Sequence, residues 1–225
     1  MRSSPSFVIP LWLCVACAPA AAQDVGRFYA GGLFGVSTLS ADARAVTTAD
    51  AASASMYKPE NGPAVNLFLG AHVARYFTLQ ANYIFNTNGL TLFASTASPG
   101  AGAFFEQMRG SSQHTFVADG LVYFRPRGQV VRPYLGTGLA VVRFSSPEAA
   151  SAIVNGLAPP AGGIEATRLA LRSHVGIDLS LAAGWSFRYS FSETIGGNPI
   201  GPHLMPAGER GLMNFQNLFG VLKHF

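Results

Sequence analysis

The segment Leu212-Met-Asn-Phe-Gln-Asn-Leu-Phe-Gly-Val-Leu-Lys-His-Phe225 ends the sequence and decides the fold that we predict for it. Counting back in twos from the final residue gives the apolar residues Val221, Phe219, Phe215 and Met213. The positions between them include Asn214, Gln216, Gly220 and His224. A period of two is that of a β-strand. The segment therefore predicts a final strand with one apolar face and one polar or small face.

The first 22 residues have the features of a secretory signal peptide. One basic residue, Arg2, precedes an apolar stretch that ends in three alanines before Gln23, an Ala-x-Ala cleavage pattern. The stretch is shorter than the roughly 18–20 apolar residues of a membrane-spanning helix. We therefore expect residues 1–22 to be removed. Both cysteines, Cys14 and Cys17, lie in this segment, so the mature chain would have no disulfide. The alternative is that Cys17 becomes a lipidated N-terminus.

Residues 23–225 have the length of one domain and an unusual composition. Hydrophobic residues make up 49% of the sequence and charged residues only 12%, about half of the usual share in soluble domains. The 15 Lys and Arg residues only slightly outnumber the 11 Asp and Glu residues, so we expect no nucleic-acid partner. A low charge content without any helical span indicates strands that face lipid.

Seven further segments show a strand period. The clearest has Phe77, Leu79, Ala81, Tyr83 and Phe85 on one face, with Thr78, Gln80, Asn82 and Asn86 on the other. The eight predicted strands lie at residues 27–39, 65–71, 77–85, 116–124, 134–144, 169–179, 185–191 and 212–225. In the fifth of these the face assignment is ambiguous, and we prefer Leu135, Leu139 and Val141 outward with Gly136 and Gly138 inward.

Long and short connections alternate between these strands. The long ones are rich in Gly, Pro, Ser and Ala and cover residues 40–62 and 87–111, the stretch from Pro147 to Gly163, and the stretch from Gly196 to Pro206. This rhythm and the even strand number are typical of an up-and-down transmembrane barrel. The predicted fold is therefore all-β: an eight-stranded antiparallel up-and-down transmembrane β-barrel.

Aromatic residues predict where the barrel meets the edge of the membrane. If both termini are periplasmic, one aromatic residue from each of five strands falls at the inner boundary. Such a girdle is expected from the preference of aromatic rings for the lipid interface. Its members are Phe28, Phe77, Phe124, Trp185 and Phe225.

The signal peptide, the eight amphipathic strands and the terminal aromatic residue together resemble the small OmpA-type outer-membrane β-barrel domain family. Local similarity lies in residues 28–32 (FYAGG), 132–138 (RPYLGTG) and 220–225 (GVLKHF), where Lys223 replaces the usual apolar residue. The resemblance implies a location in the bacterial outer membrane and recognition of the last strand by the barrel-assembly machinery. No peptidoglycan-binding domain follows Phe225, so cell-wall anchoring is not expected.

Four polar residues near the middle of their strands form the candidate site. Asp119, Arg172, His174 and Arg188 lie on faces that we assign to the barrel interior. An Arg that faced lipid at this depth would cost about 2–4 kcal/mol, which favours the inward assignment. We expect Asp119 and Arg188 to meet across the lumen. The site is either a structural ion-pair network that fills a narrow barrel or the gate of a very small pore.

Other functions have weaker support in the sequence. A lipid A deacylase would need a His-x-Ser pair with a carboxylate, and the nearest candidate, His114, has the wrong spacing. His203 and Glu209 alone are too few ligands for a metal site, and no cofactor motif is present. A soluble lipocalin-like barrel would have to bury Asp119 and Arg188 in an apolar interior, which is costly. We therefore expect a monomeric, non-enzymatic structural and surface-interaction protein whose loops meet lipopolysaccharide or other ligands. A small channel and a lipid A-modifying enzyme are the alternatives.

Overall fold

The computed structural model describes residues 26–40, 45–47, 52–97, 104–147, 151–154, 162–200 and 211–225. The predicted signal peptide and the loop residues His203 and Glu209 lie outside the described residues. The described residues contain no helix that is long and apolar enough to cross a membrane. They form eleven strands: β1 (Phe28–Ser40), β2 (Ala45–Thr47), β3 (Ala52–Pro59), β4 (Asn61–His72), β5 (Phe77–Ala97), β6 (Phe104–Tyr123), β7 (Val131–Ser146), β8 (Ser151–Val154), β9 (Ile164–Ser180), β10 (Trp185–Gly196) and β11 (Leu212–His224).

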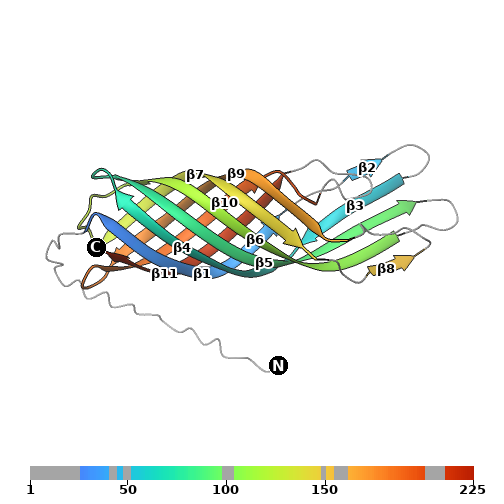
Figure 1. The fold of residues 1–225 in the computed structure, drawn as a ribbon, viewed down its shortest axis with the longest axis horizontal. Helices are drawn as coiled ribbons and strands as arrows, with labels where there is room; N and C mark the ends of the chain where they lie inside the picture. The colour runs from blue at the N-terminus through green and yellow to red at the C-terminus, as the bar shows by residue number, and fades with distance from the viewer. Residues whose placement is uncertain are drawn as a thin grey trace, which may run out of the picture.

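Eight of these strands close into an antiparallel barrel, which confirms the predicted fold (Figure 1). The order around the barrel is β5, β4, β1, β11, β10, β9, β7 and β6, and β6 pairs with β5 to complete the ring. The first and last strands pair from Tyr29 opposite His224 to Ser40 opposite Met213. This pairing leaves neither β1 nor β11 with an open edge in the barrel wall. The topology is up-and-down, because strands that follow one another in the barrel are neighbours.

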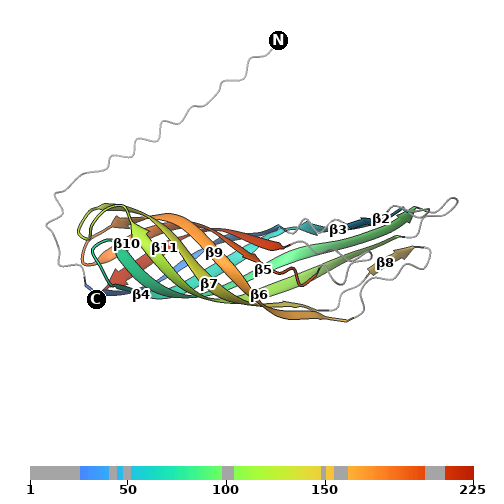
Figure 2. The same cartoon turned by 90° about the horizontal axis from the view of Figure 1, so that it is seen from above.

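The short connections all lie at one end of the barrel, which we call the turn end. Residues 73–76, 124–130 and 181–184 lie there together with Phe225, whose backbone N–H donates to the carbonyl of Phe28 at 2.8 Å. The last of these connections turns through Ala183 and Gly184, which both have positive φ. The opposite end, where β5 and β6 run past the rest of the barrel, is called the extended end (Figure 2).

Side chains alternate between the interior and the outer face along the barrel strands. In β10, Ser186 and Arg188 are buried, whereas Trp185 and Tyr189 are exposed. The preferred face assignment of β7 is also confirmed. Leu135, Leu139 and Val141 are exposed on the outer face, and a Cβ added at Gly136 or Gly138 would collide with His174 or Asp119 in the interior.

The predicted long connection at residues 87–111 is wrong over most of its length. β5 has 21 residues and β6 has 20, and the two stay paired from Phe77 opposite Val122 to Ser95 opposite Phe104. Beyond the barrel, β3 pairs with β5 and β8 pairs with β6, so strands also occupy parts of the other predicted connections. The result is a projecting sheet with the order β2, β3, β5, β6 and β8.

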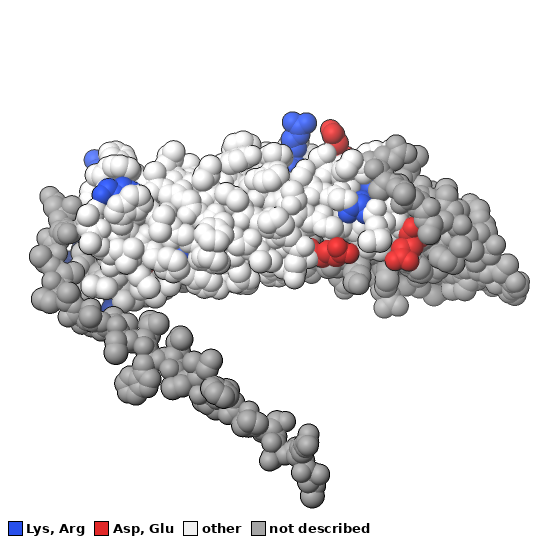
Figure 3. Space-filling model, turned by 90° about the horizontal axis from the view of Figure 1, so that it is seen from below, with Lys and Arg blue, Asp and Glu red and all other residues white. Residues whose placement is uncertain are grey.

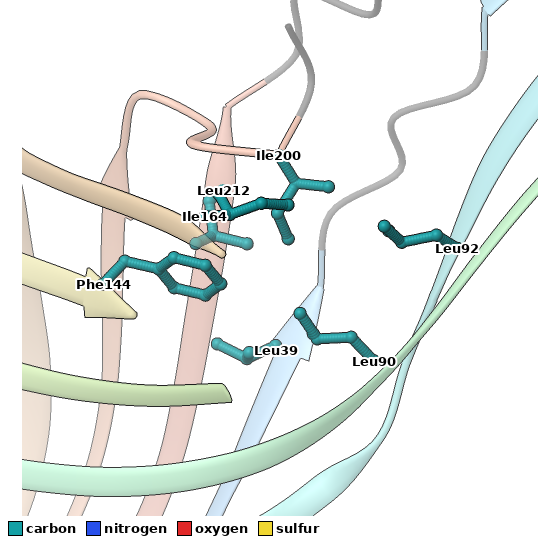
Figure 4. Close-up of a cluster of buried hydrophobic side chains, with 7 residues drawn as sticks. All are labelled: Leu39, Leu90, Leu92, Phe144, Ile164, Ile200 and Leu212. Atoms are coloured by element: carbon teal, nitrogen blue, oxygen red, sulfur yellow. The ribbon is translucent and has the colours of Figure 1, made fainter. Parts of the chain in front are cut away.

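The buried face changes its character along β5. Within the barrel it carries Gln80, Asn82 and Asn86, but farther out it carries Leu90 and Leu92. These two leucines belong to a buried group at the extended end that draws side chains from five strands and from the segment after β10 (Figure 4). We call this group the apolar cluster: Leu39, Leu90, Leu92, Phe144, Ile164, Ile200 and Leu212.

Candidate functional site

The interior near the turn end is built around the guanidinium of Arg188, which is 1% exposed. Its Nε donates to Asp178 Oδ1 at 2.6 Å and its Nη2 donates to Asp178 Oδ2 at 2.8 Å. Tyr123 also donates its hydroxyl to Asp178 Oδ2 at 2.8 Å. Asp178 on β9 and Arg188 on β10 are directly opposite each other. The short turn between these strands therefore sets the geometry of a two-bond ion pair.

A second ion pair lies farther into the barrel. Arg172 Nη1 donates to Asp119 Oδ2 at 2.5 Å, and Asn82 Nδ2 donates to the same oxygen at 2.8 Å. His174 Nε2 is 3.4 Å from that oxygen, without hydrogen-bond geometry. Asp119 on β6 and Arg172 on β9 both lie opposite Gly138 on β7, the strand between them. Gly138 has no side chain. The glycine lets the two charged side chains meet across an intervening strand.

Two amide side chains of β5 join the ion pairs into one network. Arg188 Nη1 donates to Gln80 Oε1 at 2.7 Å. Gln80 Nε2 donates to Asn82 Oδ1 at 2.7 Å, and Asn82 in turn bonds Asp119. The connection runs from Asp178 through Arg188 and the amides to Asp119. Such linked hydrogen bonds hold buried charges in one arrangement.

The four residues predicted for the interior are all buried there, but one predicted contact is wrong. Asp119 and Arg188 do not bond each other directly, because each has a closer partner on a nearby strand. Asp178, which the sequence places on the same face as Arg172 and His174, is the charged member of the network that the prediction missed. The signal that could have found it is its distance from the β9–β10 turn, which matches that of Arg188.

An uncharged layer follows toward the extended end. Asn214 Nδ2 donates to Gln113 Oε1 at 3.1 Å and to Asn86 Oδ1 at 3.2 Å. Ser37 Oγ donates to Asn214 Oδ1 at 2.6 Å, and Asn86 Nδ2 donates to Asn88 Oδ1 at 2.7 Å. These residues come from β1, β5, β6 and β11, so the layer reaches across the barrel. The apolar cluster lies beyond it.

Arg132 is the exception among the buried charges. It lies opposite Asp178 on the other side from Arg188, yet it makes no ion pair with any described residue. Its guanidinium carbon is 3.9 Å from the ring centroid of Tyr123, and no described protein group bonds its Nε or Nη2. Nearby, the imidazoles of His72 and His224 stack with centroids 5.5 Å apart. This end of the interior therefore holds more positive than negative charge.

The five predicted girdle residues all lie on the outer face at the turn end. Phe28 is next to Phe225 through the β1–β11 pairing, and Trp185 is directly opposite Lys223. Phe77 begins β5, and Phe124 follows β6. All five aromatic side chains are exposed. His114, the sequence candidate for lipid chemistry, lies on the outer face of β6, where its Nδ1 is 2.9 Å from the hydroxyl of Tyr83.

The described residues contain no group of three or more His, Cys, Asp or Glu side chains that could hold a metal ion. What the interior offers is therefore a set of ion pairs and amide bonds that span the barrel. A polar network enclosed by an apolar outer face is the arrangement of a barrel that lies in lipid, where the interior is the side shielded from hydrocarbon.

Comparisons with known proteins agree with this architecture. A family model described as the outer membrane protein beta-barrel domain matches residues 7–217. No curated protein matches the sequence. Among solved structures, Neisserial surface protein A is similar with a TM-score of 0.54 and 12% identity, over 88% of this chain and 97% of that one. The outer membrane protein OprG from Pseudomonas aeruginosa has a TM-score of 0.53 and 11% identity, over 89% of this chain and 96% of that one.

Proposed function

Because the chain belongs to the outer membrane protein β-barrel domain family, and is thus a bacterial outer-membrane β-barrel protein, we propose that it is a closed scaffold that presents an interaction surface outside the cell. In this proposal the turn end faces the periplasm and the extended end faces the exterior. The protein acts as a monomer, and its exterior part contacts lipopolysaccharide and other surface ligands.

The observation that carries the proposal is the change of faces along β5. On the outer face of β5 the apolar residues run from Phe77 to Phe85, about the nine to eleven residues with which a tilted strand crosses a bilayer. Beyond that point the outer face carries Thr87, Gly89 and Thr91, and the inner face becomes apolar. Polar outside and apolar inside is the pattern of a β-structure in water. The projecting sheet is thus built to stand outside the membrane.

The projecting sheet is also fastened to its neighbours. Arg109 on β6 donates through Nη2 to the carbonyl oxygens of Pro147 at 2.9 Å and Gly162 at 2.7 Å. These two carbonyls lie at the two ends of the connection between β7 and β9. One buried guanidinium therefore holds both ends of that connection against the hairpin. A surface that is fixed in this way loses little conformational entropy when a ligand binds.

A closed lumen is supported by three successive layers inside the barrel. The ion-pair network, the amide layer and the apolar cluster occupy the interior in turn from the turn end to the extended end. An eight-stranded barrel has room for little more than its own side chains. An ion that entered from outside would first meet the apolar cluster, which offers no group to replace its hydration shell.

Contact with lipopolysaccharide is supported by the bases at the outer boundary. Arg143 is directly opposite His114, which pairs with Phe85 at the end of the apolar outer face. Arg143 and Arg168 are both exposed. Guanidinium groups at this level can bind the phosphates of lipopolysaccharide through paired N–H donors.

Cysteine labelling in intact cells tests the orientation. Thr91→Cys places a thiol on the part of β5 and β6 that extends beyond the barrel, which we call the projecting hairpin, and Ala182→Cys places one in the β9–β10 turn. We expect a membrane-impermeant maleimide to label the first in intact cells and the second only after the outer membrane is permeabilised. The unsubstituted protein is the control for other thiols. Labelling of Ala182→Cys alone in intact cells would reverse the proposed orientation.

Shortening the hairpin tests the interaction role. Gly89 and Gly110 are directly opposite each other, so residues 90–109 can be replaced by an Asn-Gly turn that keeps the register of the barrel. We expect the shortened protein to reach the membrane in normal amounts and to lose adhesion of producing cells to immobilised lipopolysaccharide or to other cells. Equal adhesion with the full and shortened proteins contradicts the role proposed for the hairpin.

A further inference from the structure

We infer that the turn end carries a ring of binding sites for the phosphate groups of anionic phospholipids in the inner leaflet of the outer membrane. The inference rests on the proposed orientation. Five bases form the ring, and we call them the rim bases: Arg27, Arg75, Arg125, Arg127 and Lys223.

Exposed bases of the described residues lie at both ends of the barrel, whereas the exposed acids lie only toward the extended end. The four arginines among the rim bases are exposed and Lys223 is half-buried, and no exposed carboxylate side chain of a described residue lies at the turn end. The exposed acids Glu60, Glu106 and Glu165 lie toward the extended end. In Figure 3 the Asp and Glu side chains of the visible face all lie toward the extended end, whereas Lys and Arg side chains lie both at the turn end and near those acids. The turn end therefore presents a positive surface.

Three of the five rim bases are positioned by aromatic residues beside them. The guanidinium carbon of Arg27 is 5.9 Å from the ring centroid of Phe28, and that of Arg75 is 5.4 Å from the ring centroid of Tyr76. The amine of Lys223 is 5.5 Å from the ring of Trp185. Aromatic rings settle at the boundary between hydrocarbon and headgroups. The cations stacked on them are consequently held at the level of the lipid phosphates.

The rim bases surround the barrel instead of forming one patch. Arg27 precedes β1, Arg75 lies between β4 and β5, and Lys223 lies on β11 beside β10. Arg125 and Arg127 lie between β6 and β7, directly after the girdle residue Phe124. A protein partner would approach from one direction and bury one side of the rim. Lipid headgroups approach from every side, so the circular arrangement favours lipid.

The rim bases also have donors to offer. Among the described residues none of the five makes an ion pair with a carboxylate. Lys223 donates to the carbonyl of Ala183, which leaves other N–H groups of its ammonium free of that bond. Basic groups next to a membrane favour anionic headgroups over zwitterionic ones, because only the former carry a net negative charge. We expect about a fivefold change in relative affinity for each base that is neutralised.

The chain carries its own reporter for the test. One of its two tryptophans, Trp12, lies in the predicted signal peptide, and the other, Trp185, lies beside Lys223 at the turn end. Residues 23–225 refolded in vesicles would thus have a single tryptophan, which lies at the rim and can be excited selectively. Two vesicle preparations with equal mole fractions of phosphatidylglycerol and phosphatidylcholine are compared. In one the phosphatidylglycerol is brominated, and in the other the phosphatidylcholine is brominated. We expect stronger quenching of Trp185 when the bromine is on phosphatidylglycerol.

Charge variants and salt decide whether the rim bases cause the preference. Changing the four arginines to glutamine together with Lys223→Gln should abolish it, and about 0.5 M salt should weaken it by screening. The matched control is Arg143→Gln with Arg168→Gln, which removes two exposed bases from the other end and should leave the preference intact. Heat-dependent gel mobility verifies that each variant is folded.

Two results would overturn the inference. Equal quenching by the two brominated lipids would mean that the rim bases are solvated and do not select anionic lipid. A preference for phosphatidylglycerol that survives neutralisation of the rim bases would mean that other groups cause it. Failure of the proposed orientation is detected separately, because the vesicle experiment reports on Trp185 whichever end is periplasmic. Labelling that placed the turn end outside the cell would overturn the assignment to inner-leaflet phospholipid even if the phosphate preference persisted.

Discussion

Removal of the carboxylate of Asp178 should destabilise the barrel more than removal of its partner Arg188. Asp178→Asn leaves the guanidinium of Arg188 buried, at 1% exposure, without a counterion, and it leaves Arg132 on the opposite side without a nearby negative charge. Breaking one side of a buried pair costs about 3–5 kcal/mol. Arg188→Met also removes an ion pair, but Arg132 is directly opposite the freed carboxylate and can rotate toward it. We expect this variant to cost at least about 1 kcal/mol less, the value of a hydrogen bond regained.

Equilibrium unfolding in urea measures this difference. The protein is reconstituted in lipid vesicles, and the fluorescence of Trp185 follows its unfolding. Ser192→Ala is the matched control, because Ser192 is equally buried on β10 but makes a single weak bond to Gln216 at 3.3 Å. We expect about 1 kcal/mol or less for it. If Arg188→Met lowered the free energy of unfolding as much as Asp178→Asn, Arg132 would not form a replacement ion pair with Asp178. If neither exceeded the Ser192→Ala value, the network would not contribute to stability.

Three further predictions follow from the same interior. Arg132→Met should change the free energy of unfolding by less than about 1 kcal/mol in the urea assay, since it removes a buried charge that has no ion pair; a loss of 3 kcal/mol would show that the stacking on Tyr123 is essential. Phe144→Ala should cost about 3–5 kcal/mol in the apolar cluster and expose the projecting hairpin to protease, while heat-dependent gel mobility of the barrel persists. Asp119→Ala should leave planar bilayers silent, because the apolar cluster still closes the lumen; discrete conductance in that variant alone would support a gated pore instead.

Mass spectrometry of lipid A tests the remaining alternative. His114, the sequence candidate for such an activity, lies half-buried on the outer face beside Tyr83. We expect lipid A from overproducing cells to be unchanged. A change in lipid A mass that His114→Ala abolishes would overturn the non-enzymatic assignment.

The faces of the barrel strands could be predicted from the sequence because hydrocarbon imposes a strict rule on the outer side. Every outward residue of the span must be apolar or small, so an alternation such as that of residues 77–85 has one consistent reading. The same rule placed Asp119, Arg172 and Arg188 in the interior. The rule cannot predict which charged residues pair within the interior, because every inward-facing charge satisfies it equally.

The pairing of charges depends on register, which the turns set. Ser186 is opposite Ser180 across the β9–β10 turn, and two residues farther along each strand Arg188 is opposite Asp178. This contact could have been counted from the turn. The contact between Asp119 and Arg172 could not, because it passes over Gly138 on a strand that lies between them and depends on two registers at once. Sequence patterns show faces, and contacts across a strand require the closed barrel.

The projecting hairpin was not predicted because the apolar face of its strand β5 changes sides along its length. Inside the membrane the outer face gains the free energy of apolar burial by contact with lipid, so the interior is free to hold ion pairs and amides. Outside the membrane water covers the outer face, and only the interior can bury apolar surface.

The strand must therefore exchange its two faces where it leaves the bilayer. Along β5 this exchange falls between Phe85, half-buried on the outer face, and Leu90, buried in the apolar cluster. A segment that exchanges its faces loses the regular alternation by which strands are recognised, and its Gly, Ser and Thr residues then suggest a loop. The apolar cluster, which contains Leu90 and Leu92, is the core that lets the outer part of β5 remain a strand in water.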